Sequence, residues 1–231
     1  MNRLMRKLWL VSLLASAVGY VALAVPVPVT VTREAGYFAG NGGEFTIHGS
    51  PWANPNHYSP DTLVSGGFQT FCIELDEFVS GTRFAELNTA AVGGGVGGPS
   101  PDPLSKGAAW LYKQFAEGNL LGYNYTFGPG REFSAQTLQD AIWMLEQEIT
   151  PNLSNPFLAQ AVANFNNSLA LAMADHDPTV DGFTVRVLNM WGKTTSGGID
   201  YSAPKQDMLV YLPDGGMTLV LLGCGLLGLA A

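Results

Sequence analysis

The spacing of apolar residues changes twice along the chain and predicts the order of its elements. Alternating apolar and polar residues, typical of strands, occupy residues 44–48, 68–79, 83–88, 183–187 and 207–212. Between residues 104 and 175 the apolar residues recur at helical spacing. This order predicts an α+β fold: an antiparallel, β-rich domain with an insertion of about three helices between its N- and C-terminal strands.

Capping residues predict where the three helices begin. The first helix is expected after Asp102, the second over residues 135–149 after Ser134, and the third after Asn155. The glycine-rich stretch 93–103 lies before the first helix and lacks the Lys-Ser/Thr ending of a phosphate-binding loop. We interpret it as a linker.

Both ends of the chain carry features of export. Residues 1–24 combine a basic start, an apolar stretch and a small-residue site at Ala22-Leu23-Ala24, a pattern typical of a signal peptide. Residues 217–231 are also apolar, but a helix of that length reaches only about 22 Å, less than the roughly 30 Å hydrocarbon core. The chain is therefore divided into a signal peptide (1–24), one domain (25–211) and a C-terminal segment with a short hydrophobic helix (212–231).

The motif Pro213-Asp214-Gly215-Gly216 precedes the apolar C-terminal residues. Together they resemble the Pro-Asp-Gly-Gly variant of PEP-CTERM sorting signals. The resemblance implies an exosortase-type sorting enzyme as a partner and membrane association through the C-terminal helix, at least transiently. It also implies a location in the cell envelope, at the surface or outside the cell. Such tails usually end in arginines, whereas this one ends Leu229-Ala230-Ala231, so a plain C-terminal anchor is the alternative.

Charge narrows the classes of partner. The chain carries 11 basic and 19 acidic residues, and without residues 1–24, which hold three basic residues, its net charge becomes −11. Such a surface repels nucleic acid and anionic lipid. No cofactor is expected. Residues 175–177 with Asp181 offer oxygen ligands for a cation, but their spacing is not that of an EF-hand and a solvated acidic turn is commoner.

Cysteine content points to Cys72. The other cysteine, Cys224, lies in the apolar C-terminal segment, so an exported domain would keep one thiol without a disulfide partner. The alternation of residues 71–76 places Cys72, Glu74 and Asp76 on the polar face of the expected strand. The thiol is either a small inert core residue or has a partner that is not a cysteine.

Two short motifs suggest that partner. Residues 71–74 (Phe-Cys-Ile-Glu) and 138–143 (Leu-Gln-Asp-Ala-Ile-Trp) resemble the paired motifs of bacterial surface thioester (Cys-Gln) adhesion domains. The resemblance implies that Cys72 and Gln139 join, with loss of ammonia, into an internal thioester. Helical geometry puts Gln139 roughly 90° from the centre of the apolar stripe, at the rim of the core beside Trp143. Phe71 and Trp143 would then shield the bond from water.

The resemblance implies covalent adhesion, not turnover catalysis. The partner would be a nucleophile, an amine or hydroxyl, on a surface protein or polysaccharide. Two alternatives remain. One is an inert envelope or matrix structural protein with a buried free cysteine. The other is a hydrolase with Cys72 as nucleophile and His48, His57 or His176 as base.

Overall fold

The computed structural model describes residues 26–52 and 67–212. The expected signal peptide, His57, Cys224, and the sorting motif from Pro213 to Gly216 with its apolar tail lie outside these residues. The domain bounds expected from the sequence are therefore not tested by the structure.

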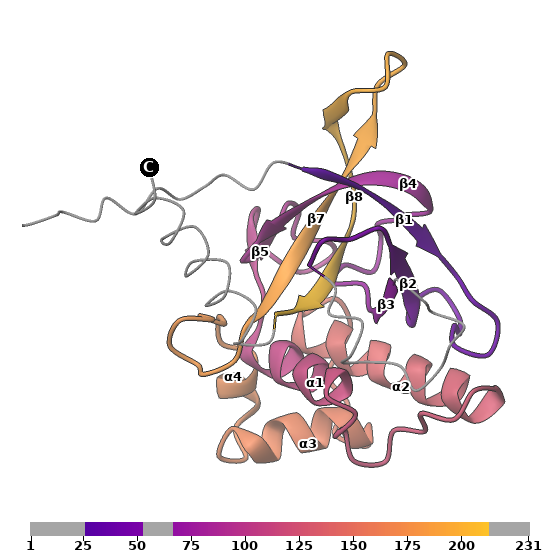
Figure 1. Ribbon diagram of the computed structural model, residues 1–231. Helices are drawn as coiled ribbons and strands as arrows, with labels where there is room; N and C mark the ends of the chain where they lie inside the picture. The colour runs from indigo at the N-terminus through magenta and orange to yellow at the C-terminus, as the bar shows by residue number, and fades with distance from the viewer. Residues whose placement is uncertain (1–25, 53–66, 213–231) are drawn as a thin grey trace, which may run out of the picture.

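An antiparallel six-stranded sheet and four helices confirm the α+β class (Figure 1). The sheet order is β3-β2-β1-β4-β7-β8, and β5 pairs separately with β6. The strands are β1 Val27–Thr32, β2 Phe45–His48, β3 Gly67–Thr70, β4 Gly81–Asn88, β5 Ala90–Ala91, β6 Asp102–Pro103, β7 Val185–Lys193 and β8 Ile199–Tyr211. The helices, inserted between β6 and β7, are α1 Lys106–Ala116, α2 Pro129–Leu145, α3 Pro156–Asn164 and α4 Leu169–Ala172.

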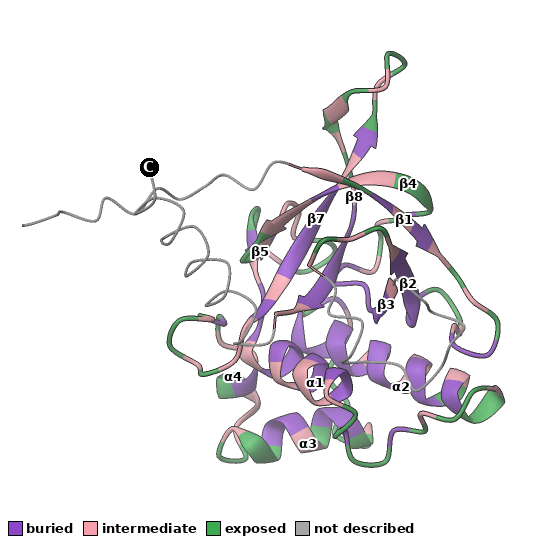
Figure 2. Cartoon of the chain, viewed as in Figure 1, coloured by how far each residue is buried: buried purple, intermediate pink, exposed green. Residues whose placement is uncertain are grey.

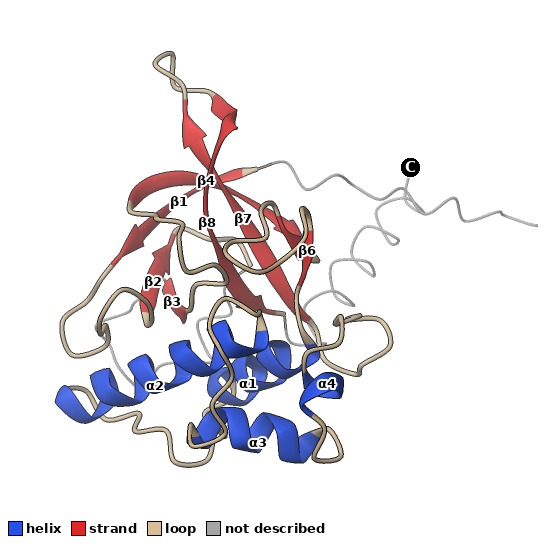
Figure 3. Ribbon diagram, turned by 180° about the vertical axis from the view of Figure 1, so that it is seen from behind, coloured by secondary structure: helices blue, strands red, loops and turns tan. Residues whose placement is uncertain are grey.

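The helices gather at one end of the sheet. Figure 3 shows them together on one side, with the tip of the β7–β8 hairpin projecting at the opposite end. Helix α1 packs on β7 and β8, and α3 packs on α1 and α2. Figure 2 shows burial along β7, β8 and the inner faces of α1 and α2. Helix α1 therefore lies between the sheet and α3 and is covered on both sides.

The sheet curls so that the chain beyond β3 meets β8. The amide of Ile73 donates to the carbonyl of Asp207 at 3.2 Å, and the amide of Leu209 donates to the carbonyl of Phe71 at 3.3 Å. Cys72 forms an isolated bridge with Met208 between these bonds. The predicted strand 68–79 is thus regular only over β3, and its continuation bridges to the far strand of the sheet.

The helix boundaries differ from those predicted. Ser105, not Asp102, caps α1, because the Ser105 hydroxyl accepts from the amide of Ala108. Asp102 lies in β6 and pairs with Ala91 of β5. Helix α2 begins at Pro129, a residue suited to a first turn, and ends at Leu145. The third predicted helix does begin after Asn155 but is interrupted by Asn166 and Asn167, both at a φ of 56°, a conformation that ends helices.

The glycine-rich stretch is not a free linker. The amide of Val96 donates to the carboxylate of Glu148, just beyond α2, at 3.0 Å. The same carboxylate accepts from the amide of Leu75 at 2.8 Å. Gly95 and Gly97 approach Glu148 and Gln147 so closely that a side chain at either would collide. The loop is therefore held against the end of α2.

Candidate functional site

Cys72 lies at the seam where the sheet curls onto β8. Its neighbours Phe71 and Ile73 use their backbone groups to bond β8, so the amide and carbonyl of Cys72 point to the other edge of the chain. Cys72 is 2% exposed and packs with residues of the sheet interior. Its thiol forms no disulfide in the described part of the chain.

Gln139 covers the free backbone edge of Cys72. Its side-chain oxygen Oε1 accepts from the Cys72 amide at 2.9 Å, and its Nε2 donates to the Cys72 carbonyl at 2.9 Å. The carboxamide thus pairs with Cys72 as a neighbouring strand would. The structure brings together the two residues that the sequence motifs singled out, 67 positions apart.

The expected rim position of Gln139 is wrong. The side chain is fully buried, at 0% exposed. Helical spacing places it on a flank of the apolar stripe of α2, but this flank meets the segment around Cys72 and the turn before β2. A flank that a sequence pattern assigns to the boundary is interior here because α2 packs on α1 and α3 and, at Gln139, is covered by Cys72 and Gly42.

The flanking aromatic residues lie on different sides. Trp143, one turn after Gln139, is 4% exposed and belongs to the same buried cluster as Cys72. Phe71 lies in the cluster on the helix side, where its ring meets Phe115 edge-on with centroids 5.0 Å apart. Of the two expected shielding residues, Trp143 therefore shares the surroundings of the thiol, and Phe71 anchors the adjacent backbone against α1.

The surroundings of Cys72 disfavour a free thiolate. Burial raises the pKa of the thiol well above its ordinary value, and the carboxyl of Glu74 raises it further. Arg33 lowers the pKa by a smaller amount. A buried thiol of this kind is a poor nucleophile toward reagents in solution.

Several buried carboxyl groups near this seam were not anticipated from the sequence. Glu74 is 1% exposed and accepts from Nε2 of Gln206 at 2.8 Å. Burial raises the pKa of both Glu74 and Asp207, and mutual repulsion raises that of Glu74 further. The expected polar face of residues 71–76 is solvent-exposed only at Asp76. Alternation alone could not indicate this, because the curl of the sheet covers both faces.

The histidines of the described residues bond elsewhere. His48 lies 3.1 Å from the hydroxyl of Thr32, and His176 lies 2.9 Å from Asp181 and stacks on Phe183. No hydrogen bond joins either ring to Cys72. Within residues 26–52 and 67–212 there is therefore no Cys-His pair of the kind a cysteine hydrolase uses.

The acidic turn after α4 is likewise committed to protein contacts. Asp181 pairs with Lys106 at 2.9 Å and accepts from the amide of Asp177 at 2.8 Å. The described residues contain no group of three or more acidic, histidine or cysteine side chains that could hold a metal ion. The suggested cation site at residues 175–177 with Asp181 is accordingly not formed.

None of the described helices is both long enough and apolar enough to cross a membrane. This finding does not extend to the C-terminal segment, which is outside the described residues. No protein-family model matches the chain, and comparisons with curated proteins and with solved structures give no significant match. The function has to be inferred from the contacts of the chain itself.

Proposed function

We propose that this is an exported cell-surface protein in which Cys72 and Gln139 form an internal thioester that captures a nucleophile on a partner surface. The observation that carries the proposal is the pair of 2.9 Å hydrogen bonds between the Gln139 carboxamide and the Cys72 backbone. They hold the carbon to be attacked beside the residue that bears the thiol.

The proposed bond forms in one balanced exchange. The Cys72 sulfur attacks Cδ of Gln139, the C–N bond breaks, and the thiol proton leaves with the amide nitrogen as ammonia. Fixing two reacting groups in this way can replace an encounter in solution by effective molarities of about 10⁵ M or more. The two hydrogen bonds that hold the carboxamide on the Cys72 backbone support this part of the proposal.

The Cys72 amide has a second use in this scheme. It donates to Oε1 of Gln139, the atom on which negative charge develops when sulfur adds to Cδ. A preorganised backbone donor at a developing oxyanion is among the strongest contributions to acyl transfer. The same hydrogen bond that positions the carboxamide would therefore also stabilise the tetrahedral intermediate.

Opening of the thioester is the adhesive step. An amine or hydroxyl of the partner adds to the Gln139 acyl carbon, the C–S bond breaks, and the nucleophile's proton goes to the Cys72 sulfur. The product is an amide or ester that links the two molecules. Because the carboxamide nitrogen is lost, the reaction occurs once per molecule.

An inert structural role is the second candidate, and two observations favour it. Both polar atoms of the Gln139 carboxamide already have backbone partners, and the thiol pKa is raised. A glutamine that only satisfies the exposed edge of a buried strand would make the same contacts. The two candidates differ in covalent structure, which can be measured directly.

The test is the intact mass of the full-length protein compared with that of its Cys72→Ala variant. Any processing at the chain ends is the same in both and cancels in the difference. With a thioester, the wild type is lighter by one ammonia than the substitution alone accounts for. Gln139→Ala should also remove this mass deficit, whereas Gln136→Ala, His48→Ala, His57→Ala and His176→Ala should preserve it.

Thiol labelling gives a second criterion if it is done on unfolded protein. Burial alone shields Cys72 in the native state, so native resistance to alkylation does not discriminate. In denaturant at mildly acidic pH, a thioester still blocks the sulfur; methylamine added after the pH is raised, so that the free amine is present, then frees the sulfur while remaining on Gln139. Full sequence mass with immediate labelling of Cys72 itself after unfolding, told apart from Cys224 by peptide mapping, would establish the inert role instead.

The chain ends support the surface location in this proposal. Residues 1–24 would be removed as a signal peptide, and residues 213–216 with the apolar tail would engage an exosortase-type enzyme and the membrane. N-terminal sequencing of fractionated cells should find a chain that starts at Val25 in the envelope or medium. A cytoplasmic protein that still starts at Met1 would contradict the location.

A further inference from the structure

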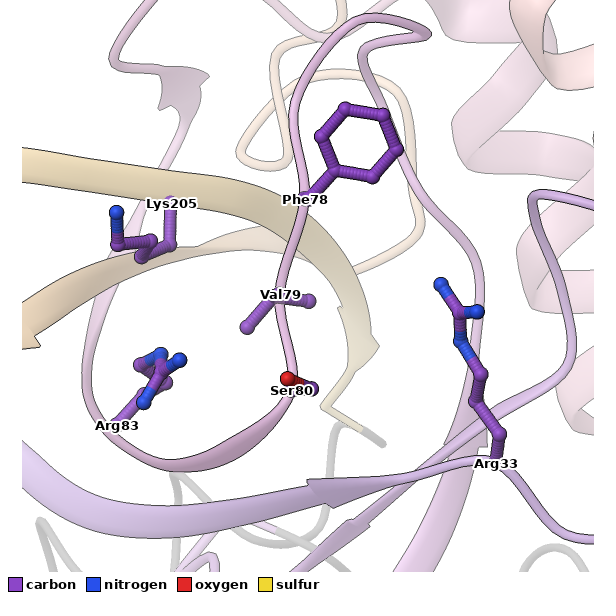
Figure 4. A pocket seen from close by; sticks show the side chains of 6 residues that line it. All are labelled: Arg33, Phe78, Val79, Ser80, Arg83 and Lys205. Carbon is purple, nitrogen blue, oxygen red and sulfur yellow. The ribbon is translucent and has the colours of Figure 1, made fainter.

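A basic hollow of about 360 Å³ opens beside the seam of the sheet (Figure 4). Its size lies at the lower end of the range for small-ligand sites, about 300–1,000 Å³. Arg33 comes from the turn after β1, Arg83 from β4 and Lys205 from β8, and the segment 78–80 completes the lining. Figure 4 shows Arg33 on one side of that segment and Arg83 with Lys205 on the other.

The charge of this hollow is unusual for the chain. The protein carries a net charge of −8, and only eight basic residues fall in the part that the structure describes. Three of those basic residues form ion pairs with carboxylates: Lys106 with Asp181, Lys113 with Glu117, and Arg131 with Glu44. None of the three cations in the hollow has such a partner among the described residues. The hollow thus gathers three cations on an acidic protein, with Glu77 within electrostatic reach of Lys205.

The two arginines are held in place without using most of their donors. Arg33 stacks over Phe38 and Phe45, with its guanidinium carbon 4.5 Å and 5.1 Å from the ring centroids. Stacking occupies the face of the guanidinium and leaves its in-plane N–H groups for an anion. Arg83 is fixed by one hydrogen bond from Nη1 to the Thr82 carbonyl. Pre-positioned donors reduce the entropy lost when a ligand binds.

The hollow borders the surroundings of Cys72. Val79 lines the hollow and belongs to the same buried cluster as Cys72. Phe45, on which Arg33 stacks, belongs to that cluster as well. A molecule bound at the hollow would therefore lie next to the core region that contains the candidate thioester.

We infer that this hollow binds an acidic polysaccharide chain and holds its hydroxyl groups at the edge of the buried region that contains Cys72 and Gln139. The inference rests on the proposed function for its second half, the delivery of a nucleophile, and is independent of it for binding. Carboxylate groups of the polymer would contact the cations, and a sugar ring would lie against Phe78, whose side chain is 68% exposed.

The arrangement favours a polysaccharide over a simple anion or an acidic peptide. The cations lie on both sides of the segment 78–80, an arrangement that suits an extended polymer with repeated charges. An exposed aromatic ring beside cations suits the apolar face of a sugar. A polyol also supplies hydroxyl nucleophiles, which an acidic peptide rich in Asp and Glu does not.

The test is reversible binding of alginate, a polyuronate, to the full-length Cys72→Ala variant, which cannot form a thioester. Arg33→Gln, Arg83→Gln and Lys205→Gln should each weaken binding about two- to fivefold, as expected for exposed ion pairs, and all three together more than tenfold. Lys193→Gln, an exposed lysine outside the hollow, is the matched control for loss of charge and should change binding little. Dextran, a neutral polysaccharide, should not compete.

The outcomes separate the two proposals. Equal binding of dextran and alginate, or equal weakening by Lys193→Gln, overturns the assignment of the hollow. Poly-glutamate or inorganic phosphate competing as well as alginate would reassign the hollow to an acidic peptide or a simple anion. If the thioester mass deficit is absent but alginate binds at the hollow, only the delivery step fails. If the deficit is present and alginate does not bind, the capture proposal stands without this subsite.

Discussion

Gly42 lies against Gln139 so closely that a methyl group at its Cα would come within 2.5 Å of Gln139 Cγ and 2.7 Å of its Cδ. The turn before β2 therefore leaves room for the glutamine only because residue 42 has no side chain. This contact fixes the carboxamide from the side opposite to its own helix. It connects a glycine in a loop to the geometry of the candidate site.

Gly42→Ala should displace the Gln139 side chain and loosen both of its bonds to Cys72. We expect a loss of about 1–3 kcal/mol in the free energy of unfolding, as for overpacked cores, and a lower fraction of molecules with the ammonia deficit. Urea unfolding and intact mass measure the two effects. Gly198→Ala, where the nearest atom would be 3.4 Å away, is the control and should change neither.

Removing Gln139 should cost more stability than removing the Cys72 sulfur. Cys72→Ala keeps the backbone amide and carbonyl bonded to the carboxamide, whereas Gln139→Ala leaves both buried and unpaired. At about 1–3 kcal/mol for each unsatisfied group, Gln139→Ala should be about 2–5 kcal/mol less stable than Cys72→Ala. Both variants lack the thioester, so the difference reports the two hydrogen bonds together with the buried volume that Gln139→Ala removes. Equal stabilities in urea would show that the Cys72 edge is satisfied in another way.

The sequence was sufficient to predict the class of fold and the order of its parts. Apolar and polar residues alternate around residues 44–48, 83–88 and 207–212, and these stretches form strands as predicted. Asn155 and Pro156 start a helix where predicted. These features depend on neighbours in the sequence. Local spacing and capping chemistry therefore identified them.

Burial at the site could not be predicted from local patterns. Gln139 and Glu74 are both polar residues on flanks or faces that a pattern assigns to the surface, yet both are buried. Gln139 is buried because the segment around Cys72 covers its flank of α2. Glu74 is buried because residues 71–73 meet β8, which lies more than a hundred positions later in the sequence. The pairing of Cys72 with Gln139 was suggested by two motifs, but its backbone hydrogen bonds required the structure.

Breaking the buried ion pair between Arg131 and Glu44 by removing its cation should strongly destabilise the native contacts around β2. Arg131 donates from Nε at 2.7 Å and from Nη2 at 2.8 Å, and both side chains are almost fully buried. Arg131→Met removes the cation and leaves Tyr123 as the donor to Glu44, so the buried carboxyl must either keep its charge without a cation or take up a proton, which should cost about 3–5 kcal/mol in urea unfolding. The double variant Arg131→Met with Glu44→Gln should recover part of that loss.

Lys113→Met is the matched control for that prediction. Lys113 pairs with Glu117 one turn later in α1, in a partly exposed position. Such pairs contribute about 0–1 kcal/mol. A loss at Arg131 as small as the loss at Lys113 would contradict a stabilising role for the buried pair.

Stability should fall as the pH rises from about 5 to 8, because buried carboxyl groups keep their protons in the folded state. Burial raises the pKa of Glu146 to about 8, against an ordinary value of 4.5, although Ser105 donates to it from both its amide and its hydroxyl. Below the ordinary pKa both folded and unfolded states are protonated and the contribution is fully present. Above it the unfolded chain releases the proton more readily, and the contribution is lost as the pH rises through about 8.

The raised pKa values of Glu74 and Asp207 also make stability fall as the pH rises. Substitution of Glu146 alone separates its contribution from theirs. Glu146→Gln keeps an acceptor for Ser105 and cannot ionise, so it should flatten the pH dependence by an amount on the order of 2–4 kcal/mol between pH 5 and 8. Urea unfolding at both pH values measures the slope. Glu117→Gln is the control, because Lys113 and Tyr211 hold the pKa of Glu117 below its ordinary value despite partial burial, and it should leave the fall in stability intact. A wild-type protein that is more stable at pH 8 than at pH 5, or a Glu146→Gln variant with an unchanged slope, would contradict this prediction.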